Sequence, residues 1–226
     1  MTTPAIRAAV DFLVERGHPV PVDIAAAAYA PTFKAALFGY ESARANLWAR
    51  VYDAVYRYLT GGSIVPTRND MKKAVADVYN TVADIAYQDG GGTLPMDEDT
   101  QAYVASEQGA QLAYVDGLFQ RLKELRKEDP DLIHEPFATA DRWASALDGF
   151  YNAVKLAGAR GQLLVWRLGF TERHCKDCAW LDGQRHRASW YRSRGYYPKK
   201  PGSATECGGY RCDCSLIDKN GNEFSI

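Results

Sequence analysis

All five cysteines of this 226-residue chain lie between residues 175 and 214, and this clustering constrains the fold more than any other feature. Cys175 and Cys178 form a C-x2-C motif, and Cys207, Cys212 and Cys214 follow after a long spacer. Two thiolates two residues apart can both lie about 2.3 Å from one ion, and a second pair can complete a tetrahedron. The spacing therefore predicts a structural zinc site that joins two distant segments.

Five thiols compete for four positions in such a site. Gly208-Gly209 allow the tight backbone turn that a ligand at position 207 requires, so the predicted set is Cys175, Cys178, Cys207 and Cys212. Cys214 is an alternative to Cys207, because residues 212 and 214 face the same side of a strand. His186 is a further alternative. Four protein ligands leave no open position for water, so we expect the ion to hold the fold and not to catalyse.

Other cysteine chemistries explain the pattern less completely. Disulfides leave one of five cysteines over and are rare in a reducing cytoplasm, and a thioredoxin-like pair needs no second cysteine group. A nucleophile formed by Cys175 with His174 or His186 leaves the other thiols unexplained. The chain also has no HExxH, GxSxG or Walker pattern and no Asp-His-Asn group near the cysteines, so we predict no catalytic residues and no enzyme.

The charge is distributed unevenly along the chain. Residues 1–170 carry 17 Lys and Arg against 21 Asp and Glu, whereas residues 171–214 carry 9 against 5, within a net charge of -1. In the basic segment, cationic side chains alternate with Trp190, Tyr191, Tyr196 and Tyr197. This pattern suits either contact with nucleic acid or a solvated, protein-binding face. The candidate DNA contacts are Arg185, Arg187, Arg192, Arg194, Lys199 and Lys200.

Residues 1–161 have the apolar spacing of a helical bundle. We expect one helix from near Tyr40 to the Gly61-Gly62 break, and a second through Ile85 capped at Thr67 or Asn69. A third should contain residues 112–125 and end before Pro130. A fourth should contain residues 143–154, with Thr139 or Asp141 as its cap. Weaker patterns mark helices at 4–16 and 22–38, and the acidic residues 96–99 suit a helix N-terminus.

Residues 162–226 contain short apolar runs at 163–168 and 212–217, a helical stretch around 190–193 and an Asn220-Gly221 turn. We therefore predict an α+β protein, mainly α, in which a helical domain (1–161) precedes a small zinc-stapled, β-rich module (162–226). The chain has no apolar run of 18 residues and no signal-peptide layout at its start, which favours a cytoplasmic protein with no membrane contact.

Residues 140–217 resemble the C-terminal half of the Mu F-like minor head protein family of tailed phages. The matching elements are a helix centred on Tyr151-Asn152-Ala153, an apolar strand and the C-x2-C-x2-L-x-G motif from Cys175 to Gly183. A spacer with Trp190 and Pro198 and a closing C-x4-C-x-C follow. Much of the family closes on His-Pro-x-Cys-Arg-Cys, whereas this chain has Cys207 and no such histidine.

The resemblance implies a virion structural protein that acts in head morphogenesis at or near the portal vertex. Its expected partners are the portal or the major capsid protein within a large assembly, and packaged DNA is a possible third partner. Its expected location is the virion head, and the host cytoplasm during assembly. From the residues alone, the alternative is a zinc-finger nucleic-acid-binding protein, which would bind free duplex with a steep dependence on salt.

Overall fold

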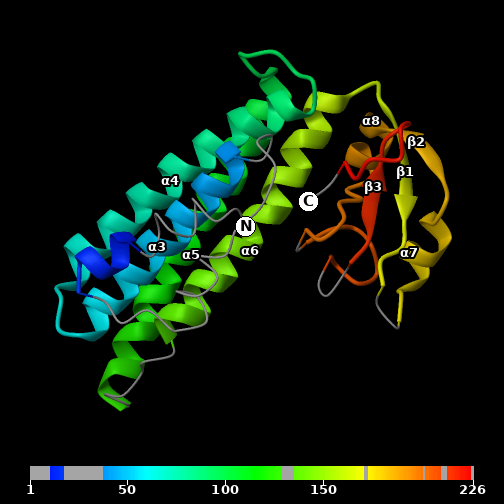
Figure 1. Cartoon of the computed structure of the whole chain (residues 1–226). Helices are drawn as coiled ribbons and strands as arrows, with labels where there is room; N and C mark the ends of the chain where they lie inside the picture. Colours follow the sequence, from blue (N-terminus) through cyan, green and yellow to red (C-terminus); the bar gives the residue numbers. More distant parts are fainter. Residues whose placement is uncertain are drawn as a thin grey trace. The chain divides into compact units, whose positions relative to one another are not determined.

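The computed structural model describes residues 11–17, 38–128, 135–170, 173–200, 202–209 and 213–224. It is mainly helical with one small antiparallel sheet, which confirms the predicted α+β class (Figure 1). The elements are α3 (Phe38–Leu59), α4 (Ile64–Asp89), α5 (Glu98–Glu128), α6 (Glu135–Ala159), β1 (Leu163–Arg167), α7 (Lys176–Leu181), β2 (Arg185–Arg187), α8 (Ala188–Ser193) and β3 (Ser215–Ile217).

The chain divides into two compact units, residues 1–82 with 104–145 and residues 83–103 with 146–226. The domain boundary expected after residue 161 falls between α6 and β1 and stays a prediction. Of the helix expected at 4–16, residues 11–16 are described; residues 11–15 are helical and Arg16 lies in the turn that follows. Its remainder and the helix expected at 22–38 lie outside the described residues, apart from residue 38, which begins α3. Among the described residues, no helix combines the length and hydropathy that crossing a bilayer requires.

In the first unit, the predicted apolar stripes form the core. Residues three or four apart share one face of a helix, so burial of that face removes a continuous apolar surface from water. The buried members include Leu47, Val51, Val55, Met71, Val75, Val78, Val115, Phe119 and Leu122. Asp53 is buried on α3 and pairs with Arg57 at 3.0 Å and with Arg16 at 3.1 Å.

The predicted helix caps of α4 and α6 are wrong, because both helices begin about one turn earlier than expected. α4 begins at Ile64, so Thr67 lies within it and its hydroxyl donates to the Ser63 carbonyl at 2.7 Å. α6 begins at Glu135, so Thr139 also lies inside the helix. Pro66 and Pro136 occupy these first turns, where a backbone N–H has no helical partner and proline is tolerated.

In the second unit, the ends of α4 and α6 approach closely through two glycines. A Cβ at Gly90 would overlap the Lys155 carbonyl, and a Cβ at Gly158 would overlap the Tyr87 carbonyl.

The acidic residues before α5 lie at its N-terminus, as expected. Asp97 accepts hydrogen bonds from the Thr100 backbone N–H at 3.0 Å and hydroxyl at 2.8 Å, as a capping side chain does.

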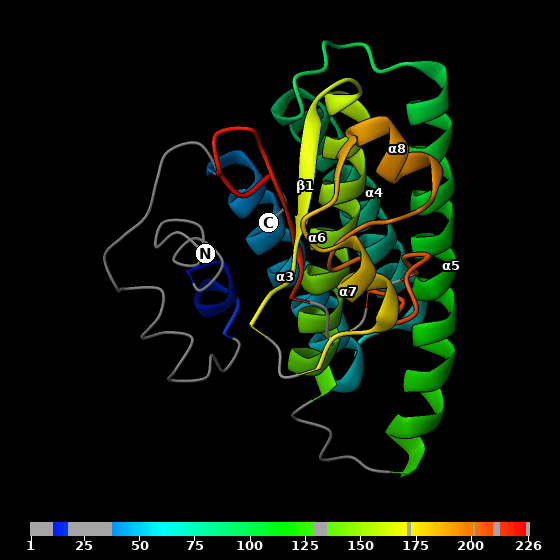
Figure 2. The same cartoon turned by 90° about the vertical axis from the view of Figure 1, so that its right-hand side faces the viewer.

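The sheet has the strand order β2-β1-β3, with both pairs antiparallel. Leu164 pairs with His186, and Trp166 pairs with Leu216. One face carries Leu164, Trp166 and Leu216, which are fully buried against α7, α8 and the end of α6 (Figure 2). After β3, Asp218 accepts from the Asn220 and Asn222 backbone N–H groups, and Gly221 has a φ of 82°. This confirms the predicted turn.

Candidate metal centre

The first cysteine segment forms the start of a short helix. Cys175 is the N-cap of α7, with φ -70° and ψ 161°, and its sulfur accepts the Cys178 backbone N–H at 3.4 Å. Cys178 lies one turn into the helix and is buried. A cap and a residue three positions later lie on the same face of a helix, so both sulfurs point to one place.

The second cysteine segment is a tight turn around Cys207. The Gly208 N–H donates to the Thr205 carbonyl at 2.7 Å, and Gly208 and Gly209 have φ angles of 60° and 76°. A Cβ at Gly209 would also overlap the Lys200 carbonyl oxygen. The backbone here therefore requires glycine for both its φ angle and its close approach, which confirms the role expected of these residues.

These two segments bring three of the predicted ligands together. The sulfur atoms of Cys175, Cys178 and Cys207 all lie within 4.8 Å of one another, and those of Cys178 and Cys207 are 3.9 Å apart. A disulfide would require about 2.05 Å. Two sulfurs on a tetrahedral zinc ion, each about 2.3 Å from it, are about 3.8 Å apart. The thiols are thus spaced as metal ligands.

Two carboxylates join the cysteine segments from outside. The Asp177 carboxylate accepts the Glu206 backbone N–H at 2.7 Å, and the Glu206 carboxylate accepts the Lys176 backbone N–H at 2.8 Å. Thr205 is buried, and its hydroxyl lies 3.3 Å from the Cys207 sulfur. The cysteine spacing alone predicts none of these three residues. In the sequence, Asp177 and Glu206 each stand directly before a cysteine, and this placement was the one signal that could have indicated them.

The electrostatics of the site favour thiolate. Burial raises the pKa of the Cys175 thiol, but hydrogen bonds from Cys178 and Cys207 outweigh it and hold that pKa below its ordinary value. A thiol must lose its proton to become a metal ligand. The hydrogen bond from the Cys178 backbone N–H at the start of α7 therefore also prepares Cys175 for coordination.

The fourth position is a separate question. Cys212, the remaining member of the predicted set, lies outside the described residues. Cys214 is buried in the apolar cluster that also contains Cys178, but its sulfur is not one of the three that gather within 4.8 Å. His186, the other alternative, is also not in that group. Its ring stacks on Trp190 with centroids 3.6 Å apart, and its Nε2 lies 3.0 Å from the Gln184 side-chain oxygen.

The structure places the six candidate cationic contacts in different surroundings. Lys199 pairs with Glu223 at 3.5 Å, Lys200 lies over the Tyr197 ring, and Arg194 lies over Trp190 at 4.2 Å. Arg192 is half-buried on α8. Arg185 and Arg187 are exposed at the edge strand β2 and line a surface pocket.

No family model, curated protein or solved structure matches this chain. The functional assignment therefore depends on the cysteine cluster and on the sequence resemblance described above.

Proposed function

We propose that this protein is a non-enzymatic structural component of a tailed-phage head, in which a zinc ion holds the C-terminal segments as a rigid docking unit. The observation that carries the proposal is the gathering of three thiols from segments about 30 residues apart. Cys175, Cys178 and Cys207 would bind the ion, and Cys212 would complete the tetrahedron. Zinc is favoured because thiolate ligands in a tetrahedral set are typical of structural zinc sites.

The small size of the sheet explains why a metal is needed. β2 and β3 have three residues each, fewer than the usual strand length of about 5–6, so few backbone hydrogen bonds hold the sheet together. A structural zinc site contributes about 10–16 kcal/mol of apparent binding free energy in small domains. That binding free energy is comparable to the net stability of a typical domain, about 5–15 kcal/mol. A filled coordination sphere also leaves no position for a reactive water.

The role in the phage head rests on the resemblance of residues 140–217 to the Mu F-like minor head proteins. Two exposed apolar side chains of this unit offer anchors for a portal or capsid partner. Phe170 is fully exposed and Trp180 is 58% exposed. Large aromatic side chains of this kind often carry much of the binding free energy at protein interfaces. The proposed location is the virion head, reached from the host cytoplasm.

The zinc part of the proposal is tested by metal analysis of the full chain purified under reducing conditions. We expect one zinc per chain, and a folded, metal-free preparation would contradict the proposal. Chelation should unfold the sheet while the helices of the first unit keep their circular dichroism.

The assembly part is tested by co-expression with a tailed-phage portal protein and major capsid protein, the partners that the proposal names. Mass spectrometry should detect the protein in purified particles, and its complete absence would overturn the head role. The F170A/W180A variant should keep its zinc and lose incorporation. Tyr114, which is 66% exposed in the first unit, provides the matched control as Y114A. Equal loss in both variants would contradict the proposed anchors.

A further inference from the structure

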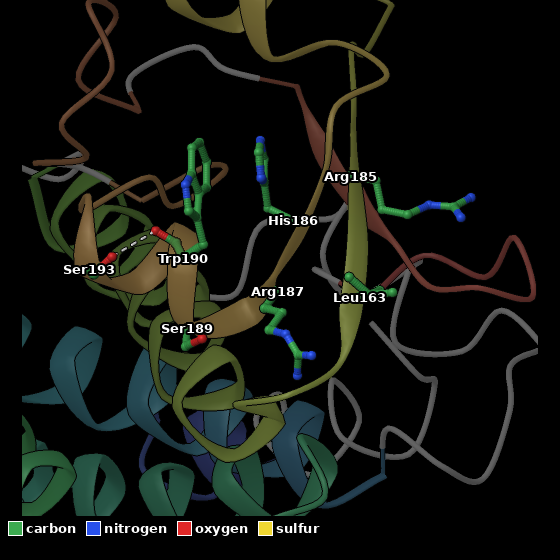
Figure 3. Close-up of a pocket in the computed structure, with 7 residues that line it drawn as sticks. All are labelled: Leu163, Arg185, His186, Arg187, Ser189, Trp190 and Ser193. Carbon is green, nitrogen blue, oxygen red and sulfur yellow. Dashed lines mark hydrogen bonds between the residues drawn. The ribbon is translucent and has the colours of Figure 1, made fainter.

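The antiparallel sheet of the second unit has two different faces. The paired residues Leu164 and His186 lie on the same face as Trp166, which is buried against the helices. Arg185 and Arg187 flank His186 on β2, so their side chains leave the opposite face. Figure 3 shows both arginines pointing away from the His186 ring. We call this opposite side the outer face of the sheet; from β1 and β2 it carries Leu163, Val165, Arg167, Arg185 and Arg187.

The outer face carries a diagonal line of three arginines. The register pairs Val165 of β1 with Arg185, and Arg167 lies two residues further along β1 on the same face. Arg167 and Arg185 are therefore diagonal neighbours, about 7–8 Å apart. Arg185 and Arg187 occupy alternate positions of β2 and are about 6–7 Å apart. All three side chains are exposed.

The charge of this line is not neutralised within the part of the chain that the structure describes. None of the three guanidinium groups forms an ion pair there. Asp182 and Asp213 lie beyond the end of β1, where each accepts a backbone N–H from residues 168–170. Glu223, which bridges to β3, pairs with Lys199 at 3.5 Å. Exposed cations without a counter-charge attract an anionic partner.

The arrangement of the guanidinium groups suits a repeating anion. Arg185 and Arg187 are not placed to share one small anion, because their side chains diverge (Figure 3). A polymer can instead offer a different phosphate to each arginine. Guanidinium donors match phosphate in a planar, bidentate way. The outer face has no aromatic side chain from β1 or β2 on which a base could stack, so the contacts are to the backbone of the polymer.

We propose that the outer face of the sheet binds the phosphate backbone of double-stranded nucleic acid, independently of sequence, through Arg167, Arg185 and Arg187. A duplex carries one negative charge per about 1.7 Å of its length, about twice the density of one strand, so the duplex is the favoured form. Of the six cationic candidates that the sequence suggests, only Arg185 and Arg187 belong to this surface, and Arg167 is an addition to them. The alternative occupant is an acidic protein segment.

This surface goes beyond the structural role proposed above and does not depend on it. Zinc content and particle incorporation test that role, whereas duplex binding by the purified full chain tests the outer face. Either proposal can therefore fail while the other stands.

The experiment measures fluorescence anisotropy of a short labelled DNA duplex at about 50 mM salt. The competitors are a duplex of unrelated sequence, the single strand and poly-glutamate. We expect the two duplexes to compete equally and the single strand to compete less well per phosphate, since its charge density is lower. Preference for one sequence or for the single strand would contradict recognition of the duplex backbone. Stronger competition by poly-glutamate than by the duplex would assign the face to an acidic protein.

Charge variants locate the contacts. R185Q/R187Q should weaken duplex binding about tenfold and reduce the slope of log affinity against log salt by about 1.8, or about 0.9 for each lost phosphate contact. R185K/R187K keeps both charges and should retain that slope. The control K73Q/K123Q removes the same net charge from exposed positions of α4 and α5 and should bind like the wild type. Equal weakening in the control, or unchanged binding in R185Q/R187Q, would refute the surface.

Two further variants separate the faces of the sheet. R167Q should weaken duplex binding and reduce the salt slope by about 0.9, because Arg167 lies on the outer face. H186A changes the other face and should bind the duplex normally. Circular dichroism of each variant verifies that it is folded. Weakened binding by folded H186A would place the contact in the pocket that His186 lines with α8, and would overturn the assignment to the outer face.

Discussion

The Asp177 carboxylate accepts a hydrogen bond from the Glu206 backbone N–H at 2.7 Å, and the Glu206 carboxylate in turn accepts one from the Lys176 backbone N–H at 2.8 Å. This reciprocal pair connects the helix that carries Cys175 and Cys178 to the turn that carries Cys207. Residues outside a coordination sphere that orient its ligands commonly affect metal affinity. The pair therefore has a function that the cysteines alone cannot supply.

We expect D177A/E206A to lower zinc affinity about tenfold, because the two ligand segments lose their mutual alignment. A chelator-competition assay with the purified protein measures this change. The loss of stability should be small, about 1 kcal/mol, since both hydrogen bonds are exposed to solvent. Asp84 is an exposed carboxylate on α4, and D84A is the control. Unchanged zinc affinity in D177A/E206A would show that the two cysteine segments align without these carboxylates.

Substitution of single cysteines identifies the ligands. C178S should release zinc and destabilise the second unit by more than about 4 kcal/mol, as loss of a structural metal does. C214S should keep its zinc and lose about 1–2 kcal/mol, because it buries a hydroxyl in an apolar cluster. Zinc content and urea unfolding separate the two outcomes. Loss of zinc in C214S with retention in C207S would show that Cys214, and not Cys207, is the ligand.

G158A should destabilise the protein by about 1–3 kcal/mol, the usual cost of overpacking a close contact. The added methyl group would overlap the Tyr87 carbonyl where α4 and α6 approach. G109A is the matched control, because Gly109 lies within α5 with nothing near its Cβ position. That change should stabilise the helix by about 0.5–1 kcal/mol. Thermal unfolding compares G158A with G109A. An unchanged melting temperature in G158A would show that α4 and α6 can move apart to accommodate the methyl group.

Asp97 should make stability depend on acid pH. Burial raises the pKa of its carboxyl, but hydrogen bonds from Thr100, Arg160 and Tyr87 outweigh burial and hold that pKa well below its ordinary value. The folded state therefore binds this proton less readily than the unfolded chain. The stabilisation by the Asp97 carboxylate is complete above the pKa of Asp in the unfolded chain, about 3.9. It is lost as the pH falls through the pKa of Asp97 in the folded protein.

Urea unfolding of the wild type and D97N from pH 7 to pH 3 measures this contribution. Asparagine still caps a helix, so the variant retains the cap and loses the charge. At pH 7, D97N should be about 1 kcal/mol less stable, and the difference should shrink below about pH 4. Acid also releases the metal, but this loss affects the wild type and D97N equally. The difference between their free energies of unfolding at each pH therefore does not contain it. A constant difference would show that the Asp97 charge contributes nothing.

Local patterns predicted most of the helices, because apolar residues at helical spacing need only a partner surface to become buried. The stripes through Val51, Val75 and Phe119 are buried as expected. The helix starts were wrong where Pro66 and Pro136 occupy first turns, since Thr, Asn and Asp residues further along offered competing cap signals. The C-x2-C spacing indicated a metal site because it depends on the geometry of one turn.

By itself, the sequence determined most of the long helices and the pairing of Cys175 with Cys178, since these features depend on spacing along a helix or a turn. Among the described residues, the tertiary structure brought Cys207, and neither Cys214 nor His186, to that pair. Only the tertiary structure decided that Asp177 and Glu206 join the cysteine segments, and that Arg167 lies beside Arg185 on one face of the sheet while Lys199 is neutralised. These relationships connect residues that are distant in the chain or depend on which neighbours surround them. Close packing in three dimensions selects such neighbours, and no local pattern records them.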